Sequence, residues 1–218
     1  MKKPIKCIIF DLDGTLLNTL NALATACNLA LSDFALKPRE LDEYRHLVGN
    51  GARRLCEQAS GLGGERLEEF MQNYFMHYER ILCDDSGPYD GVVQCLDELK
   101  QRNIRSAVYT NKPQAWSDRL LAHYLPGRFE LIVGAQKDLP VKPHPWGVEQ
   151  IQKHLAVERK SICLIGDSDV DIMTAKAAQI MSIGAAWGFR GRQELQAAGA
   201  DYIIDDATQL LALMDSLP

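Results

Sequence analysis

Two carboxylates stand close together near the start of the chain, in the segment Asp11-Leu12-Asp13-Gly14-Thr15. They follow the short apolar run at residues 5–10, which has the composition of a strand buried on both faces. A Gly-containing loop at the carboxyl end of such a strand is where open α/β sheets bind ligands. Of two acids placed there, one can attack a substrate or hold a metal while the other moves a proton. The segment therefore predicts a catalytic site.

Other polar residues follow later strands of the predicted sheet, namely Thr110-Asn111, Lys142, Asp167 and Asp171. Since parallel strands all end at one edge of a sheet, we expect these residues to meet the first loop in one crevice. The four aspartates of that crevice would repel each other strongly, and one lysine cannot balance them. A divalent cation can, and a set of oxygen ligands without His or Cys favours Mg²⁺ over Zn²⁺.

The remaining polar groups of the crevice suit an anion. Lys142 and the hydroxyl of Thr110 are available to hold one. Thr110-Asn111 is also expected to open a helix, whose free N–H groups favour a phosphate, and Lys112 is then expected to be exposed on its first turn. Carboxylates, a metal and anion donors together indicate phosphoryl transfer to a carboxylate nucleophile.

The elements that must position these residues alternate between strands and helices over most of the chain. Strands are predicted at residues 5–10, 106–110, 131–133, 161–165, 181–183 and 202–204, and a helix at residues 144–155 between the third and fourth of them. Repeated βα units imply a parallel sheet with helices on both faces. Between the first two strands only helical spacing of apolar residues is found. We therefore expect a Rossmann-like α/β core of residues 1–17 and 86–218, with residues 18–85 inserted as an α-helical cap domain.

Bulk properties exclude several classes of function. The 218-residue chain is 46% hydrophobic and carries a net charge of -5, which argues against nucleic acid or an anionic membrane as a partner. Its six cysteines have no metal-ligand spacing, and no apolar run approaches the length of a membrane span. The first apolar run is too short for a signal peptide. We expect a soluble, cytoplasmic protein, and nothing in the sequence indicates its oligomeric state.

Four segments together resemble the motifs of the haloacid dehalogenase superfamily in order and spacing: Asp11-Leu12-Asp13-Gly14-Thr15, Thr110-Asn111-Lys112, Lys142-Pro143-His144-Pro145 and Gly166-Asp167-Ser168-Asp169-Val170-Asp171. The helical insertion resembles the superfamily's α-helical cap. Further segments are similar to phosphoglycolate phosphatases: Val48-Gly49-Asn50-Gly51, Pro88-Tyr89-Asp90-Gly91-Val92, Thr110-Asn111-Lys112-Pro113 and Trp187-Gly188-Phe189.

The resemblance implies a role for each residue of the motifs. Asp11 is the expected nucleophile, which becomes an aspartyl phosphate, and Asp13 is the expected acid and then base. Mg²⁺ is expected on Asp11, the Asp13 backbone carbonyl and Asp167, with Asp171 supporting that shell. Thr110 and Lys142 are expected to bind the phosphoryl group, assisted by the backbone at Gly14 and Asn111. Asn50 could reach the other end of the substrate from the cap, or belong to a plain glycine turn.

Asp13 decides between subclasses of the superfamily. A phosphatase needs an acid there because an alkoxide leaving group must receive a proton, whereas dehalogenases and phosphonatases of the superfamily lack it. We therefore expect a phosphatase for a small phosphorylated metabolite, such as phosphoglycolate. A sugar phosphomutase and a pyrophosphatase of the same superfamily are the enzymatic alternatives. A phospho-accepting signalling module is the non-enzymatic one, although it needs neither a cap nor a second acid.

Overall fold

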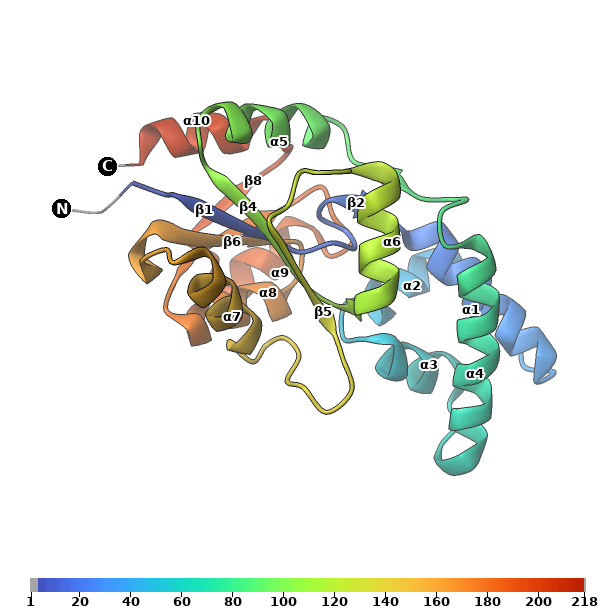
Figure 1. The fold of residues 1–218 in the computed structure, drawn as a ribbon. Coiled ribbons are helices and arrows are strands. Elements are labelled where there is room, and N and C mark those ends of the chain that lie inside the picture. Colours follow the sequence, from blue (N-terminus) through green and yellow to red (C-terminus); the bar gives the residue numbers. More distant parts are fainter. Residues whose placement is uncertain (1–3, 218) are drawn as a thin grey trace.

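Within residues 4–217, which this computed structural model describes, six parallel strands form one sheet in the order β5-β4-β1-β6-β7-β8 (Figure 1). The strands are β1 (Cys7–Phe10), β4 (Arg105–Pro113), β5 (Leu131–Ala135), β6 (Ile162–Gly166), β7 (Met181–Ala185) and β8 (Tyr202–Ile204). The chain runs outward from β1 through β4 and β5, then returns to β6 on the other side of β1. The strand order therefore reverses at β1, where such sheets bind ligands. The predicted fold class is confirmed.

Helices cover both faces of the sheet because the strands are apolar on both faces. Ile8 and Phe10 of β1 belong to the core shared with α5 (Val92–Gln101), α6 (Gln114–Tyr124) and α10 (Gln209–Ser216). Cys7 and Ile9 point to the opposite face, as the period of two requires. There they meet α7 (Trp146–Leu155) and α8 (Asp169–Ala178), and α9 (Gly191–Ala198) packs beside α8. The 3-10 turn η1 (Arg159–Ser161) directly precedes β6.

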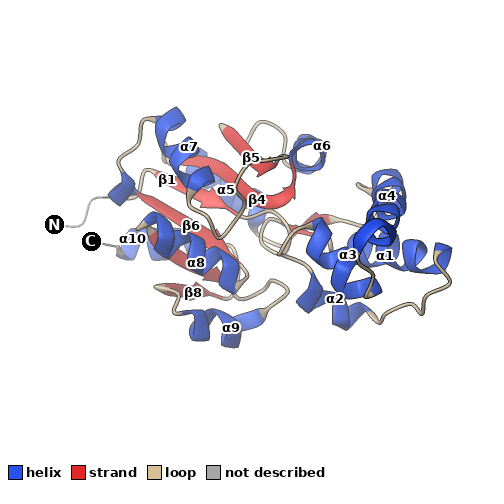
Figure 2. Ribbon diagram, turned by 90° about the horizontal axis from the view of Figure 1, so that it is seen from below, coloured by secondary structure: helices blue, strands red, loops and turns tan. Residues whose placement is uncertain are grey.

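The segment between β1 and β4 is helical, as its spacing predicts. It contains α1 (Leu20–Asp33), α2 (Leu41–Leu47), α3 (Ala52–Ser60) and α4 (Gly64–Ile81), which pack on one another beyond the edge where β1 and β4 end (Figure 2). Two short antiparallel strands, β2 (Leu17–Asn18) and β3 (Gly87–Pro88), join this group to the sheet. We call residues 18–85 the cap and propose that it is a separate domain, with the core beginning again at residue 86.

Two predicted helix starts are wrong for the same physical reason. Thr110-Asn111 does not open a helix, because β4 continues through Pro113 and α6 begins at Gln114. The next helix begins at Trp146 rather than at His144. In both places a proline lies just before the helix, and the residue that precedes a proline is disfavoured in the α conformation. In the part of the chain that is described, no helix is long and apolar enough to cross a membrane.

Candidate active site

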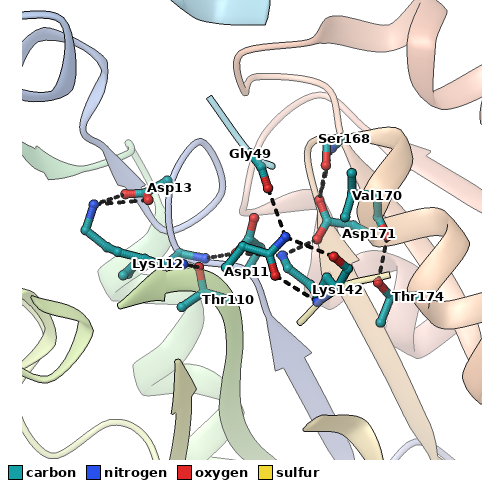
Figure 3. A network of polar contacts seen from close by, with 12 residues as sticks. Asp11, Asp13, Gly49, Thr110, Lys112, Lys142, Ser168, Val170, Asp171 and Thr174 are labelled. Atoms are coloured by element: carbon teal, nitrogen blue, oxygen red, sulfur yellow. Dashed lines mark hydrogen bonds and ion pairs between the residues drawn. The ribbon is translucent and has the colours of Figure 1, made fainter. Parts of the chain in front are cut away.

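Three of the predicted acids meet at the edge of the sheet. Asp11 follows β1, Asp167 follows β6, and Asp171 lies in the first turn of α8. Each can offer a carboxylate oxygen within 4.8 Å of the others, and all three are buried. Lys142 joins them, since its Nζ lies 2.8 Å from Oδ1 of Asp11 and 2.6 Å from Oδ1 of Asp171 (Figure 3). The convergence that the parallel sheet predicts is therefore present.

The charges of this cluster do not balance. Three carboxylates face one ammonium, which leaves an excess of negative charge in a buried place. Burial is the main reason that the pKa of Asp11 rises to about 6; Lys142 opposes the rise and Asp171 adds to it. Burial and the two neighbouring carboxylates raise the pKa of Asp167 well above its ordinary value. Such a set of oxygen donors with unbalanced charge fits a hard divalent cation.

Lys142 stays charged in spite of its burial. Burial alone would lower its pKa, but the carboxylates of Asp11 and Asp171 raise it above its ordinary value. Its backbone is fixed by Asn111, whose Oδ1 accepts from Lys142 N at 2.8 Å and whose Nδ2 donates to Lys142 O at 3.1 Å. The same Nδ2 also donates to Gly49 O of the cap at 3.1 Å. The side chain of Asn111 thus holds the lysine loop and the cap together.

Asp171 is held in place by its own helix start. Ser168 precedes α8, and its backbone N and Oγ donate to Oδ2 of Asp171 at 3.1 and 2.7 Å. The Ser168 side chain also accepts from the backbone N–H of Asp171, which completes a capping box that the spacing of Ser168 and Asp171 in the sequence indicates. Oδ2 of Asp171 therefore accepts hydrogen bonds at the start of α8, while Oδ1 contacts Lys142.

Two glycines allow the loops to close around Asp167. Gly14 has φ +82°, and a Cβ there would lie 2.4 Å from Oδ2 of Asp167. A Cβ on Gly188 would lie 2.2 Å from Cβ of Asp167 and 2.4 Å from Gly14 O. Phe189 N donates to Oδ2 of Asp167 at 2.8 Å. The segment Trp187-Gly188-Phe189, which sequence resemblance alone singles out, thus holds a residue of the acidic cluster.

Asp13 is turned away from the acidic cluster. Its two carboxylate oxygens lie 3.0 and 3.1 Å from Nζ of Lys112, and Thr19 Oγ1 donates to Oδ1 at 2.7 Å. Lys112 is buried, so the prediction that it is exposed is wrong. It lies on β4 rather than on a helix, and its Nζ also donates to the hydroxyl of Tyr78 in α4 at 2.7 Å. The two acids of the first loop therefore have separate surroundings.

A small cavity of about 40 Å³ lies between the core and the cap. Asp11, Asp13 and Thr110 line it on the core side. Its other walls are mostly apolar and include Leu23, Val48, Ala52, Leu55, Tyr74 and Trp116. Asn50 is exposed and does not line the cavity, although Gly49 and Gly51 on either side of it do. The structure therefore brings together the predicted core residues but not the predicted cap residue.

Comparison with known proteins gives the class of this site. Residues 8–185 match the haloacid dehalogenase-like hydrolase family. The chain belongs to this family, as its motifs predict, and it is an enzyme of the phosphatase type.

Individual relatives and solved structures are similar to the chain over nearly its whole length. The chain is 34% identical over 213 residues to a phosphoglycolate phosphatase of Colwellia psychrerythraea, with 94% of each chain covered. It is 30% identical to the phosphoglycolate phosphatase of Haemophilus influenzae, over 98% of this chain and all of that one. A solved structure from Haemophilus somnus, described as a predicted phosphoglycolate phosphatase, is 30% identical with a TM-score of 0.88, over 96% of this chain and 97% of the other. One from Lactobacillus delbrueckii subsp. bulgaricus has a TM-score of 0.93 at 25% identity, over 97% and 99%.

Proposed function

We propose that the protein is a Mg²⁺-dependent phosphatase that hydrolyses a small phosphate monoester through an aspartyl phosphate on Asp11. The observation that carries the proposal is the separation of the two acids of the first loop. Asp11 lies in a cluster that needs a cation, whereas Asp13 faces the same cavity outside that cluster. This separation supports Asp11 as the group that attacks phosphorus and Asp13 as the group that transfers the proton.

The proposed reaction has two steps at the same phosphorus atom. In the first, an oxygen of Asp11 bonds to phosphorus, the ester bond breaks, and the leaving oxygen takes a proton from Asp13. In the second, water attacks the aspartyl phosphate, Asp13 takes the water's proton, and Asp11 is released as a carboxylate. Thr110 and Lys142 hold the phosphoryl oxygens. Mg²⁺ on Asp11 and Asp167, with Asp171 supporting that shell, would supply the positive charge that the cluster lacks.

The cavity supports a short leaving group. A small cavity with mostly apolar walls suits a short chain better than a sugar with its ring of hydroxyls. Lys112 is the one cationic side chain among the lining residues that the structure describes, and it is already paired with Asp13. A sugar phosphomutase must hold a second phosphate, and these lining residues offer it no unpaired cation. The lining of the cavity therefore disfavours a sugar phosphomutase. The names of the relatives make 2-phosphoglycolate the first candidate substrate.

The test is release of inorganic phosphate from a panel of esters, with Mg²⁺ and with EDTA. The panel contains 2-phosphoglycolate, ethyl phosphate, a hexose phosphate and pyrophosphate. We expect Mg²⁺-dependent release that is greatest for a short ester and absent in Asp11→Asn. Asp169→Asn is the matched control. Asp169 shares the first turn of α8 with Asp171 but lies outside the acidic cluster, so the variant removes a nearby carboxylate without changing the cluster. Release that is equal in EDTA, or none from the folded, Mg²⁺-loaded protein, contradicts the proposal.

A further inference from the structure

Lys112 carries a buried ammonium group that the proposed reaction does not yet use. Its side chain is 3% exposed, and its Nζ contacts both carboxylate oxygens of Asp13 and the hydroxyl of Tyr78. An ammonium has three N–H donors, so these contacts account for all of them. The Nζ also lies 4.7 Å from the centre of the Tyr78 ring, within the range of a cation–π contact.

Burying an ammonium costs free energy unless it is paired and hydrogen-bonded. Here the desolvation would lower the pKa of Lys112, but Asp13 and Tyr78 outweigh it and raise the pKa above its ordinary value. The charge is therefore retained in a place that lines the substrate cavity. Together with Thr19 Oγ1, Lys112 fixes the direction of the Asp13 carboxylate.

Tyr78 makes this arrangement depend on the cap. It lies on α4, is fully buried and stacks on Tyr74, 5.8 Å between ring centres, and against Trp116 of α6 at 4.8 Å. The position of its hydroxyl is therefore fixed by the packing of α4 of the cap against α6 of the core. The chain of contacts runs from the cap through Tyr78 and Lys112 to Asp13.

We propose that Lys112 is a positioning residue for Asp13, anchored from the cap by the Tyr78 hydroxyl. The inference rests on the proposed phosphatase function, in which Asp13 gives its proton to the leaving oxygen while Asp11 bonds to phosphorus. Lys112 keeps its own protons throughout and faces the carboxylate that Asp13 becomes. Asp13 is thus held in this orientation only while the Tyr78 hydroxyl of α4 contacts Lys112 of β4.

The test uses esters of equal length whose leaving groups differ in their need for a proton. These are ethyl, 2-fluoroethyl, 2,2-difluoroethyl and 2,2,2-trifluoroethyl phosphate, since each fluorine makes the departing alkoxide less basic. We expect Lys112→Met to lower kcat/KM for ethyl phosphate by about 10² or more, the lower end of what general acid catalysis contributes, and for the trifluoroethyl ester only a few-fold. An equal loss on all four esters assigns Lys112 a purely structural role and overturns the proposal.

Tyr78→Phe tests the link to the cap and serves if Lys112→Met does not fold. It keeps the ring but removes the hydroxyl, and we expect a smaller loss with the same dependence on the leaving group. Tyr124→Phe is the matched control, because its hydroxyl donates to Cys83 O outside the cavity. An unchanged profile in Tyr78→Phe refutes the cap anchor. Failure of the wild type on all four esters and on 2-phosphoglycolate refutes the proposed function instead.

Discussion

Removing the Asp11 carboxylate should stabilise the metal-free protein at neutral pH, although the same change abolishes the proposed reaction. In the absence of a cation this carboxylate is buried beside Asp171, with Lys142 shared between the two. Asp11→Asn leaves the ion pair between Lys142 and Asp171 intact. The new amide oxygen can still accept from Leu12 N, which Oδ1 of Asp11 does at 2.7 Å. The substitution therefore removes a disfavoured charge and few contacts.

The magnitude follows from the pKa of Asp11, which rises from 3.8 to about 6 on folding. A shift of about two pKa units corresponds to about 3 kcal/mol. Because the folded pKa is raised, this contribution to stability is fully present below pH 3.8 and is lost as the pH rises through about 6. Wild type and Asp11→Asn should thus be close in stability near pH 4. Above pH about 7 the variant should be more stable by about 3 kcal/mol, or about 6–12 °C in Tm.

The assay is thermal unfolding in EDTA, followed by circular dichroism at pH about 4 and about 7.5, on either side of the titration. Asp169→Asn controls for the loss of any carboxylate near α8. Addition of Mg²⁺ should then stabilise the wild type more than Asp11→Asn, because the cation balances the charge that the substitution removes. A variant that is less stable than the wild type at pH about 7.5 in EDTA refutes the reasoning about this cluster.

Three further predictions concern the cavity and its rim. Asp13→Asn should abolish turnover of ethyl phosphate, whereas stabilisation of the protein by Mg²⁺ should remain, because Asp13 lies outside the acidic cluster. Loss of that stabilisation in thermal unfolding contradicts the prediction. Leu55→Ala should widen the apolar wall, raise kcat/KM for butyl relative to ethyl phosphate, and cost about 2–5 kcal/mol in urea unfolding; an unchanged ratio means that Leu55 does not limit size. Asn111→Ala should raise KM for the preferred ester, because it releases the Lys142 loop and Gly49, and an unchanged KM contradicts that link.

The core of the site could be predicted because its geometry is a property of the sheet. Asp11 and Asp167 each directly follow a buried apolar strand, and neighbouring parallel strands place the residues at their carboxyl ends side by side. The side chain of Asp171 is then oriented by the capping box with Ser168, which the spacing of these two residues in the sequence also indicates. Resemblance to known motifs adds the roles, but the convergence itself needs only strands and their ends.

The burial of Lys112 could not be predicted in the same way. Its anchor, Tyr78, lies 34 residues away in another part of the fold, and only the packing of α4 against the core brings the two together. A local signal was available for the backbone, since Pro113 opposes a helix at Lys112 and favours the extended strand that is found. The exposure of Asn50 could not be predicted either. The glycines beside it predict a turn, but they do not fix the direction of its side chain.

The central claim is that phosphate passes through Asp11, and acid-quenched mass spectrometry during turnover of 2-phosphoglycolate with Mg²⁺ tests it most directly. Asp13→Asn with 2,2,2-trifluoroethyl phosphate should let the intermediate accumulate, since that leaving group needs less protonation than ethoxide while the second step still lacks its base. The account predicts a phosphoryl group on the peptide that contains Asp11, and none in EDTA. Steady release of phosphate with no phosphoryl group on the protein, or with one on another residue, would contradict it.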